Sequence, residues 1–291
     1  MLKPCRNEIR SGKKITRKGR VGVLKQTGAK KPVARKLLLK LLGSRDNVQM
    51  TAASAVRVGQ LFGISENNIR VTLNRLQSTK MLSLLDRGYY QLGKGGEKFA
   101  REINSWRDAE SSLLPSWNES WIAVQTNMLS KSDKKQTREN ERALKIVGLR
   151  KVFTDMYVRP ANIAGGAAVV REKLCTLGLS KQAVVYCASE FDLKLQSKIR
   201  NLWNTEELEK QYKQGISDVE ASLLRLPNLT LEEATFESFH VGDYALHQLV
   251  FDPLLPSPLT DEALRREFSE LVKHYDDVGA QIWHRFLSLD Q

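Results

Sequence analysis

Gly63–Leu82 reads GISENNIRVTLNRLQSTKML, and this stretch predicts the second helix of a helix-turn-helix. Ser65 is a good N-cap, because its hydroxyl can accept a hydrogen bond from an unpaired amide in the first turn. Ile69, Leu73 and Leu76 then recur at spacings of four and three residues, which defines one apolar helix face. The short turn at Gly63 joins this helix to another apolar-striped helix before it.

The opposite face of the same helix carries side chains that can contact DNA bases. It holds Asn67, Asn68, Arg70, Val71, Asn74 and Arg75. Asn can bond adenine, Arg can bond guanine or phosphate, and Val can touch a thymine methyl group. An ordinary amphipathic helix with a solvated polar face is the alternative. The absence of Glu and Lys between Glu66 and Lys80 favours a recognition helix in the major groove.

The residues around this helix predict a winged helix. Helices are expected over Ala34–Leu42 and Ala52–Phe62, with a polar loop over 44–51 between them. Met81–Leu92 has two short apolar runs around Asp-Arg-Gly, which is hairpin-turn chemistry. Arg87 would then lie at the tip of a wing, beside the DNA backbone or in the minor groove. Otherwise the hairpin is purely structural and Arg87 is an ordinary surface residue.

The net charge of +13 is concentrated at the N-terminus. Residues 1–40 contain 14 Lys and Arg against one acid, Glu8, and the remaining 251 residues hold 32 basic and 32 acidic side chains. The composition of residues 1–31 predicts a disordered basic arm. Such an arm binds phosphates with a steep salt dependence, here through Lys13, Lys14, Arg17, Lys18 and Arg20. The alternative is an unselective solubilising tail.

Composition also excludes several classes of protein. No apolar run approaches the ~18 residues of a membrane span, and the charged N-terminus does not resemble a signal peptide. Cys5, Cys175 and Cys187 show no paired metal spacing and no disulfide framework. A cytoplasmic location is therefore expected, and 291 residues allow two or three domains.

The middle of the chain predicts a ferredoxin-like domain. Gly95-Gly96 is expected to break the chain before a linker helix over Glu97–Leu114. The segments that follow are a strand over Trp121–Thr126, a helix over Arg138–Val147, one or two strands over Lys151–Val158, a helix over Asn162–Leu177 and a strand over Ala183–Cys187. Whether Thr154-Asp155 is a turn or continuous strand stays open. With the turn, the order is β-α-β-β-α-β.

The rest of the chain is expected to be helical from Lys198 onward. Helices are predicted over Glu206–Leu224, Val241–Val250 and Asp261–Leu287, the last with Thr260 as its cap. The expected class is therefore α+β. Its parts are a basic disordered arm over 1–31, a winged helix-turn-helix over 32–96, a linker helix over 97–117, a ferredoxin-like middle domain over 118–190 and a helical C-terminal domain over 191–291.

This succession of motifs resembles the phenylacetic-acid-degradation transcriptional repressors, the PaaX-type regulators. The matching stretches are ARKLLLKLLG from residue 34, the recognition helix, GYYQLGKGGEKF from residue 88, SWNESWIAV from residue 116 and IRNLWNTEELEKQY from residue 199. Many winged helices share the first motifs, whereas the order of all five is much more specific. The long basic arm departs from the family, whose typical members lack it.

The resemblance implies a cytoplasmic homodimer that binds double-stranded operator DNA. It implies release when an aryl-acyl-CoA thioester such as phenylacetyl-CoA binds outside the DNA-binding domain. No effector-binding residue can be assigned by motif. Arg159 is a candidate for an anionic group such as a CoA phosphate, and Gly165-Gly166 could hold a phosphate or simply make a turn. A nucleic-acid-binding or architectural protein that uses the arm without an effector is the alternative function.

Enzymatic readings are disfavoured by the residues present. The ferredoxin-like pattern also resembles small CRISPR-associated nucleases, which use an acidic residue at the end of the first strand. Here Asn127 follows that strand, while Asp133 and Asp155 lie elsewhere. The histidines, His240, His247, His274 and His284, have no partners at zinc-ligand spacing. No catalytic residue, metal or cofactor is expected.

Overall fold

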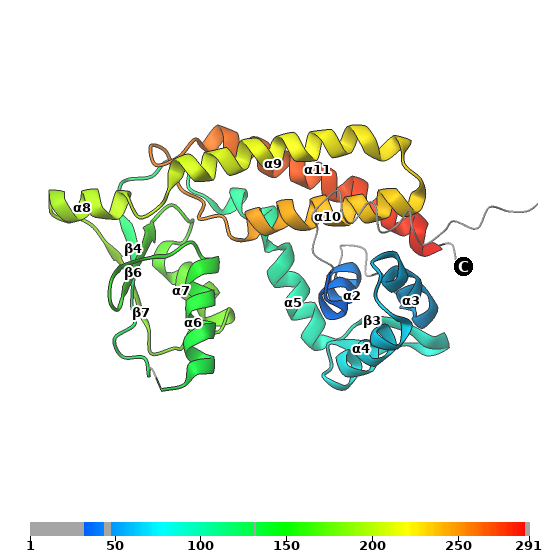
Figure 1. Ribbon diagram of the computed structural model, residues 1–291. Helices are drawn as coiled ribbons and strands as arrows, with labels where there is room; N and C mark the ends of the chain where they lie inside the picture. Colours follow the sequence, from blue (N-terminus) through cyan, green and yellow to red (C-terminus); the bar gives the residue numbers. More distant parts are fainter. Residues whose placement is uncertain (1–31, 44–47, 131, 289–291) are drawn as a thin grey trace, which may run out of the picture.

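The computed structural model describes residues 32–43, 48–130 and 132–288. The expected basic arm and its residues Lys13, Lys14, Arg17, Lys18 and Arg20 lie outside the described residues. Within the described residues, helices combine with two small antiparallel sheets, so the expected α+β class is confirmed. Figure 1 shows the N-terminal part and the middle sheet at opposite ends of the long C-terminal helices.

The N-terminal part combines short helices with a three-stranded sheet of order β1-β3-β2. Its elements are α2 (Ala34–Leu42), β1 (Met50–Thr51), α3 (Ala52–Leu61), α4 (Glu66–Ser78), β2 (Leu82–Leu84) and β3 (Tyr89–Leu92). α2 has the predicted bounds, and the predicted hairpin is formed by β2 and β3. The loop predicted over 44–51 is wrong at its end, because Met50 and Thr51 pair with β3. A two-residue strand has no alternation for the sequence to reveal.

The helix after this sheet begins earlier than predicted. α5 (Lys94–Asn104) starts after its N-cap Gly93, so Gly95 and Gly96 lie in its first turn and do not break the chain. A Cβ at Gly96 would lie 2.2 Å from the Met81 carbonyl oxygen, so this close crossing requires glycine. The predicted linker helix is also wrong at its end, because α5 gives way to 3-10 turns over Ser105–Asp108 and Glu110–Ser112.

The middle part is a four-stranded antiparallel sheet of order β5-β6-β4-β7. Its elements are β4 (Trp121–Gln125), α6 (Lys134–Ile146), β5 (Arg150–Phe153), β6 (Met156–Pro160), α7 (Gly166–Thr176) and β7 (Val184–Ala188). The succession of strands and helices agrees with the predicted one. Thr154 and Asp155 form the turn between two separate strands.

Both helices of the middle part differ from prediction at their first residues. α6 begins before the predicted Arg138, because the Asp133 carboxylate caps it and accepts from the amides of Lys135 and Gln136 at 2.8 and 3.1 Å. α7 begins four residues after the predicted Asn162. Gly165 is its N-cap and Gly166 its first residue, with φ of +81° and +56°, a backbone conformation that favours glycine.

Both faces of the middle sheet are covered. Ile122 and Val124 point toward α6 and α7, as expected from the two-residue period of a strand. Trp121 points to the other face, where its ring lies 6.1 Å from that of Trp203 and 5.0 Å from that of Trp117. Leu255 joins this second cluster. This face of the sheet is thereby packed against the segments around Trp117, Trp203 and Leu255.

The C-terminal part is helical, as predicted, with different bounds. Its helices are α8 (Leu193–Arg200), α9 (Thr205–Arg225), α10 (Leu231–Val250) and α11 (Glu262–Leu287). α9 agrees with prediction to within one residue at each end. The prediction misses the first half of α10, although Thr230 and Glu233 form a capping box there. Asp261, and not Thr260, caps α11.

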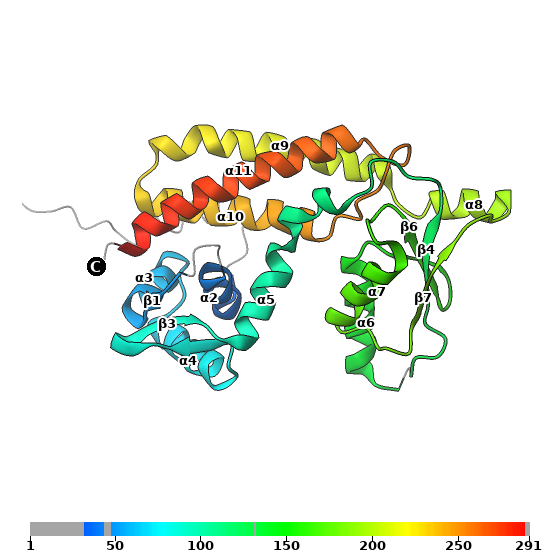
Figure 2. The ribbon, with the colours of Figure 1, turned by 180° about the vertical axis from the view of Figure 1, so that it is seen from behind.

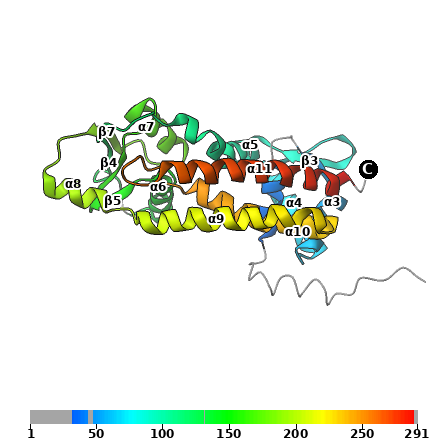
Figure 3. The same ribbon diagram turned by 90° about the horizontal axis from the view of Figure 1, so that it is seen from above.

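The long helices α9, α10 and α11 pack side by side (Figure 3). Phe268, Val272 and Tyr275 of α11 are buried against Tyr212 and Val219 of α9. The apolar stripe of α11 is thus buried within the chain. Among the described residues, no helix is long and apolar enough to cross a membrane.

The N-terminal part shares its core with α10 and α11. The Phe62 ring, which is fully buried, lies 5.3 Å from Phe236, 4.8 Å from Phe239 and 6.4 Å from Trp283. Beside this aromatic cluster, Lys36 and Lys40 of α2 both pair with Asp243 of α10. These contacts fix the N-terminal part to the C-terminal helices.

Candidate nucleic-acid interface

α4 is held in place by its apolar face and by its cap. The Ser65 hydroxyl accepts from the Asn68 amide at 3.4 Å, as the sequence predicts. Ile69, Leu73 and Leu76 are buried in the N-terminal core. α3 crosses α4 closely at Gly59, where a Cβ would lie 2.5 Å from Ile69. The rotation of α4 about its own axis is therefore fixed by packing.

That rotation exposes all six side chains predicted to read DNA. They are Asn67, Asn68, Arg70, Val71, Asn74 and Arg75. Arg70 donates to Glu66 at 2.8 Å, and this ion pair is exposed at both ends. No described carboxylate pairs with Arg75, so its guanidinium is available to an incoming acceptor. The face presents amide and guanidinium donors around one apolar side chain, Val71, which is 38% exposed.

The hairpin beside α4 ends in a tight turn. Leu85 donates to the Tyr89 carbonyl at 2.7 Å, and Gly88 adopts a φ of +78°. Arg87 occupies the middle of the 3-10 turn over Asp86–Gly88 that joins β2 and β3. The backbone thus places residue 87 at the tip predicted for it.

α4 lies on the side of the N-terminal part that faces away from the long C-terminal helices (Figures 1 and 2). Basic and acidic residues are distributed unevenly between the N-terminal part and the C-terminal helices. Basic residues outnumber acidic ones across residues 32–104, and acidic residues outnumber basic ones across 191–291. A polyanion is therefore attracted toward the N-terminal part and repelled by the C-terminal helices, within the screening length of the solution.

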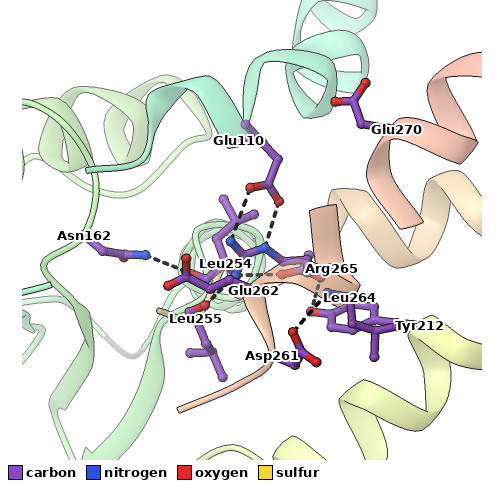
Figure 4. A network of polar contacts seen from close by, with 12 residues as sticks. Glu110, Asn162, Tyr212, Leu254, Leu255, Asp261, Glu262, Leu264, Arg265 and Glu270 are labelled. Carbon is purple, nitrogen blue, oxygen red and sulfur yellow. Dashed lines mark hydrogen bonds and ion pairs between the residues drawn. The ribbon is translucent and has the colours of Figure 1, made fainter. Parts of the chain in front are cut away.

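Arg159, the candidate for an anionic ligand, lies inside the molecule. Only 1% of it is exposed, and it donates to the carbonyls of Val147 and Pro160 and to the side chain of Asn162. Burial lowers its pKa to about 10. Asn162 in turn donates to the Leu254 carbonyl at 2.7 Å, so this cluster joins the middle sheet to the segment between α10 and α11 (Figure 4).

The other candidates from the sequence lie apart from one another. His240 and His247 are on α10, and His274 and His284 are on α11. Among the described residues, no group of three or more His, Cys, Asp or Glu side chains is placed to hold a metal ion. Asp133 caps α6 and Asp155 lies in a turn between strands. Gly165-Gly166 makes the turn into α7.

The sequence reasoning misses a buried polar junction near the same segment. Arg265 of α11 is 1% exposed and forms two hydrogen bonds with Glu110, of 2.8 and 3.2 Å (Figure 4). Tyr212 donates to the buried carboxylate of Asp252 at 2.6 Å. The sequence does carry a signal for the burial of Arg265, because Arg265 stands in helical register with the apolar Phe268 and Val272 and so shares their helix face. Its partner Glu110, 155 residues away, had no such signal.

Comparison with known proteins agrees with the family recognised in the sequence. Residues 203–285 match the family described as PaaX-like protein C-terminal domain. The fold is similar to that of the uncharacterized protein Rv0674 from Mycobacterium tuberculosis, with a TM-score of 0.53 and 16% identity over 85% of this chain and 98% of that one. No curated protein matches the chain in sequence. The C-terminal helices are thus similar to the C-terminal domain of the PaaX-like proteins.

Proposed function

We propose that this chain, which carries the C-terminal domain of the PaaX-like proteins, is a sequence-specific DNA-binding repressor of transcription. Members of this family are transcriptional regulators rather than enzymes. The observation that carries the proposal is α4, whose polar face is exposed while its apolar face is buried. Together α2, α3, α4 and the β2–β3 hairpin support a winged helix-turn-helix over residues 32–96.

In this proposal, each exposed group has a chemical task. Arg75 bonds a guanine, Asn67 and Asn74 bond adenine edges, and Val71 contacts a thymine methyl group. Asn68 and Arg70, at the start of the helix, contact bases or phosphates. Arg87 lies against the flanking backbone or in the minor groove. The arm over 1–31 adds phosphate affinity.

The remaining parts of the proposal concern regulation and assembly. The strand order of the middle sheet supports a ferredoxin-like domain over 118–190, with a linker over 97–117 and a helical domain over 191–291. The repressor acts as a homodimer and is released from its operator by an aryl-acyl-CoA thioester. Two-fold symmetry of the protein then matches a palindromic operator.

Binding of the DNA upstream of the chain's own gene tests the proposal by gel retardation. Arg75→Ala should weaken binding to the retarded fragment by ~1–3 kcal/mol and leave binding to random DNA almost unchanged. Arg225→Ala is the matched control, because Arg225 is an exposed arginine on α9 that pairs with Glu237. An equal loss on both DNAs would show that Arg75 contacts only phosphate.

Two further measurements separate the proposal from its alternative. Deletion of residues 1–31 should reduce the salt dependence of DNA binding and leave the preference for the upstream fragment over random DNA largely unchanged. Phenylacetyl-CoA should reverse the retardation. Specific binding that no thioester or aromatic acid relieves would leave an effector-independent nucleic-acid-binding protein.

A further inference from the structure

The outward side of α6 carries all the basic side chains of that helix. α6 packs on the middle part through Asn140, Ala143 and Leu144, which are buried. At about 100° per residue, the basic residues fall within an arc of roughly 100°, centred opposite those buried positions. We call them the basic face of α6, and all five are exposed: Lys134, Lys135, Arg138, Arg142 and Lys145.

The charges of the basic face are not neutralised within the chain. Glu139 and Glu141 lie at the two margins of the arc, and neither forms an ion pair with a described residue. Arg171 of the neighbouring helix α7 differs, because its guanidinium donates to the Val185 carbonyl. Across the described ranges, no carboxylate pairs with any cation of the basic face. These cations are therefore open to an anion from outside the chain.

The basic face lowers the stability of the helix that carries it. Lys134 and Lys135 are the first two residues of α6, where the positive end of the helix dipole disfavours cations. Asp133 caps this end, but the first turn itself contains no acidic residue. Lys134, Arg138 and Arg142 follow one another at four-residue spacing, so their like charges repel. A bound polyanion would relieve both unfavourable effects, which an ordinary solvated helix face avoids by mixing charges.

The basic face is on the same side of the molecule as the proposed DNA-reading helix. α6 and α7 lie on the side of the middle sheet that looks toward the N-terminal part, and α6 and α4 both extend away from the long C-terminal helices (Figures 1 and 2). Residues 118–190 hold 12 basic and 7 acidic side chains, whereas acidic residues predominate in 191–291. A polyanion that meets α4 is therefore attracted toward α6 as well.

The length of the basic face suits the backbone of duplex DNA. From Lys134 to Lys145 the helix rises by about 16 Å, and the phosphates of one strand follow one another every ~3.4 Å along the duplex axis. The face thus spans roughly five phosphates of one strand. At its C-terminal end, Lys145 borders a shallow depression together with Arg150, Lys151 and Glu141. The positive surface therefore continues from α6 onto β5.

We propose that the basic face of α6 is a second DNA-contact surface, which binds the phosphate backbone of the duplex beside the site read by α4. The position beside that site rests on the proposed function, whereas the affinity for duplex DNA rests on α6 itself. The contact adds affinity without sequence preference, because phosphates carry no base information. It also lengthens the stretch of DNA that one chain covers.

Gel retardation with duplexes of two lengths tests this surface in the full chain. The short duplex is the smallest part of the upstream fragment whose binding Arg75→Ala still weakens. The long duplex adds two helical turns of random sequence, about 20 base pairs, on each side. Arg138→Gln/Arg142→Gln removes two charges from the middle of the basic face. Its control is Lys210→Gln/Lys213→Gln, which removes two exposed cations from α9.

The two variants should differ on the long duplex only. Arg138→Gln/Arg142→Gln should weaken binding to it by about tenfold at about 0.1 M salt, and should reduce the slope of log affinity against log salt by about 2 per bound chain. Its binding to the short duplex should equal that of the unaltered protein. The control should leave binding to both duplexes unchanged. Because the change relieves like-charge repulsion, Arg138→Gln/Arg142→Gln should not lower the melting temperature.

The possible failures are distinguishable. Equal affinity of the unaltered protein for both duplexes overturns the surface and leaves DNA reading by α4 intact, as does unchanged long-duplex binding in Arg138→Gln/Arg142→Gln. If that variant loses binding to phosphatidylserine vesicles but not to DNA, the basic face binds anionic lipid and the proposal is overturned. If the unaltered protein prefers no DNA sequence, the proposed function fails. The basic face is then measured on random duplex, where a roughly tenfold loss in the variant supports it and unchanged affinity overturns it.

Discussion

Removal of Glu110 should destabilise the protein far more than removal of an exposed glutamate with the same geometry. Glu110 holds Arg265, with 2.8 Å between Arg265 Nε and Glu110 Oε1, and Arg265 is 1% exposed. Burial lowers the pKa of Arg265, but the hydrogen bonds and charge of Glu110 outweigh it and raise that pKa. Glu110→Ala therefore leaves a buried, charged guanidinium without its carboxylate partner, which costs about 3–5 kcal/mol.

The matched control is Glu66→Ala. Glu66 also accepts from an arginine Nε, that of Arg70, at 2.8 Å, but both side chains are more than half exposed. An exposed pair at this spacing contributes about 0.3–0.5 kcal/mol. The measurement is urea unfolding followed by far-UV circular dichroism, with the free energy extrapolated to water.

A double-mutant cycle completes the experiment. Arg265→Met combined with Glu110→Ala should lose much less than the sum of the two single changes, because no charge is left buried without a partner. Equal losses for Glu110→Ala and Glu66→Ala would refute the reasoning, as would strict additivity in the cycle. Either result would mean that solvent reaches Arg265.

Three other predictions concern the cap of α4, the half-buried His240 and the buried Asp252. Ser65→Ala should lower the stability of the N-terminal part by about 1 kcal/mol in thermal melting, because the first turn of α4 loses its acceptor. Burial lowers the pKa of His240 from 6.5, against a raising effect of Asp243 and with a further lowering by Lys40, so stability should fall as pH drops below 6.5. His240→Leu should remove that slope in melting temperatures measured across the range. Burial raises the pKa of Asp252 above 3.8, despite its hydrogen bond from Tyr212, so its contribution to stability is present below 3.8 and is lost as pH rises through the folded-state pKa. Asp252→Asn should reduce this loss of stability with rising pH. Equal slopes of melting temperature against pH in the Asp252→Asn and unaltered proteins would contradict the prediction.

The sequence predicts elements well where a local signal sets both the type and the start. α4 is such a case, because the Ser65 cap and a regular apolar stripe both lie within the segment. The first half of α10 has no clean stripe. Phe236 and Phe239 there pack against the N-terminal part, so apolar residues surround the helix instead of following one face. The local signs of its true start are the capping box at Thr230 and the acidic residues of the first turn, Glu232 and Glu233.

Features that depend on distant partners could not be predicted in this way. The six side chains predicted to read DNA are assigned from one helix, and the structure exposes them as expected. The attachment of α2 to α10 instead depends on residues more than 200 positions apart, since Lys36 and Lys40 meet Asp243 only in the folded chain. Arg159 shows the opposite error. Its charge suggested a ligand, whereas its donors are used by backbone carbonyls inside the fold.

The shared aromatic core limits how an effector can act in the proposed function. Detaching the N-terminal part would expose Phe62, Phe236 and Phe239, which are at most 8% exposed. At about 1.5–3 kcal/mol for each side chain, that exposure costs roughly 5–9 kcal/mol. A ligand of micromolar affinity has about 8 kcal/mol of binding free energy in total, and it shifts an equilibrium only by its differential affinity for the two states. Full detachment of the N-terminal part would therefore consume nearly all of the ligand's binding free energy.

A tilt that keeps Phe62 buried costs far less, and a small displacement of α4 suffices to break base contacts that depend on hydrogen-bond geometry. Effector-bound protein should accordingly keep the Phe62 cluster protected from hydrogen exchange while losing its operator, and deprotection of the α3 and α10 amides around it would show detachment instead.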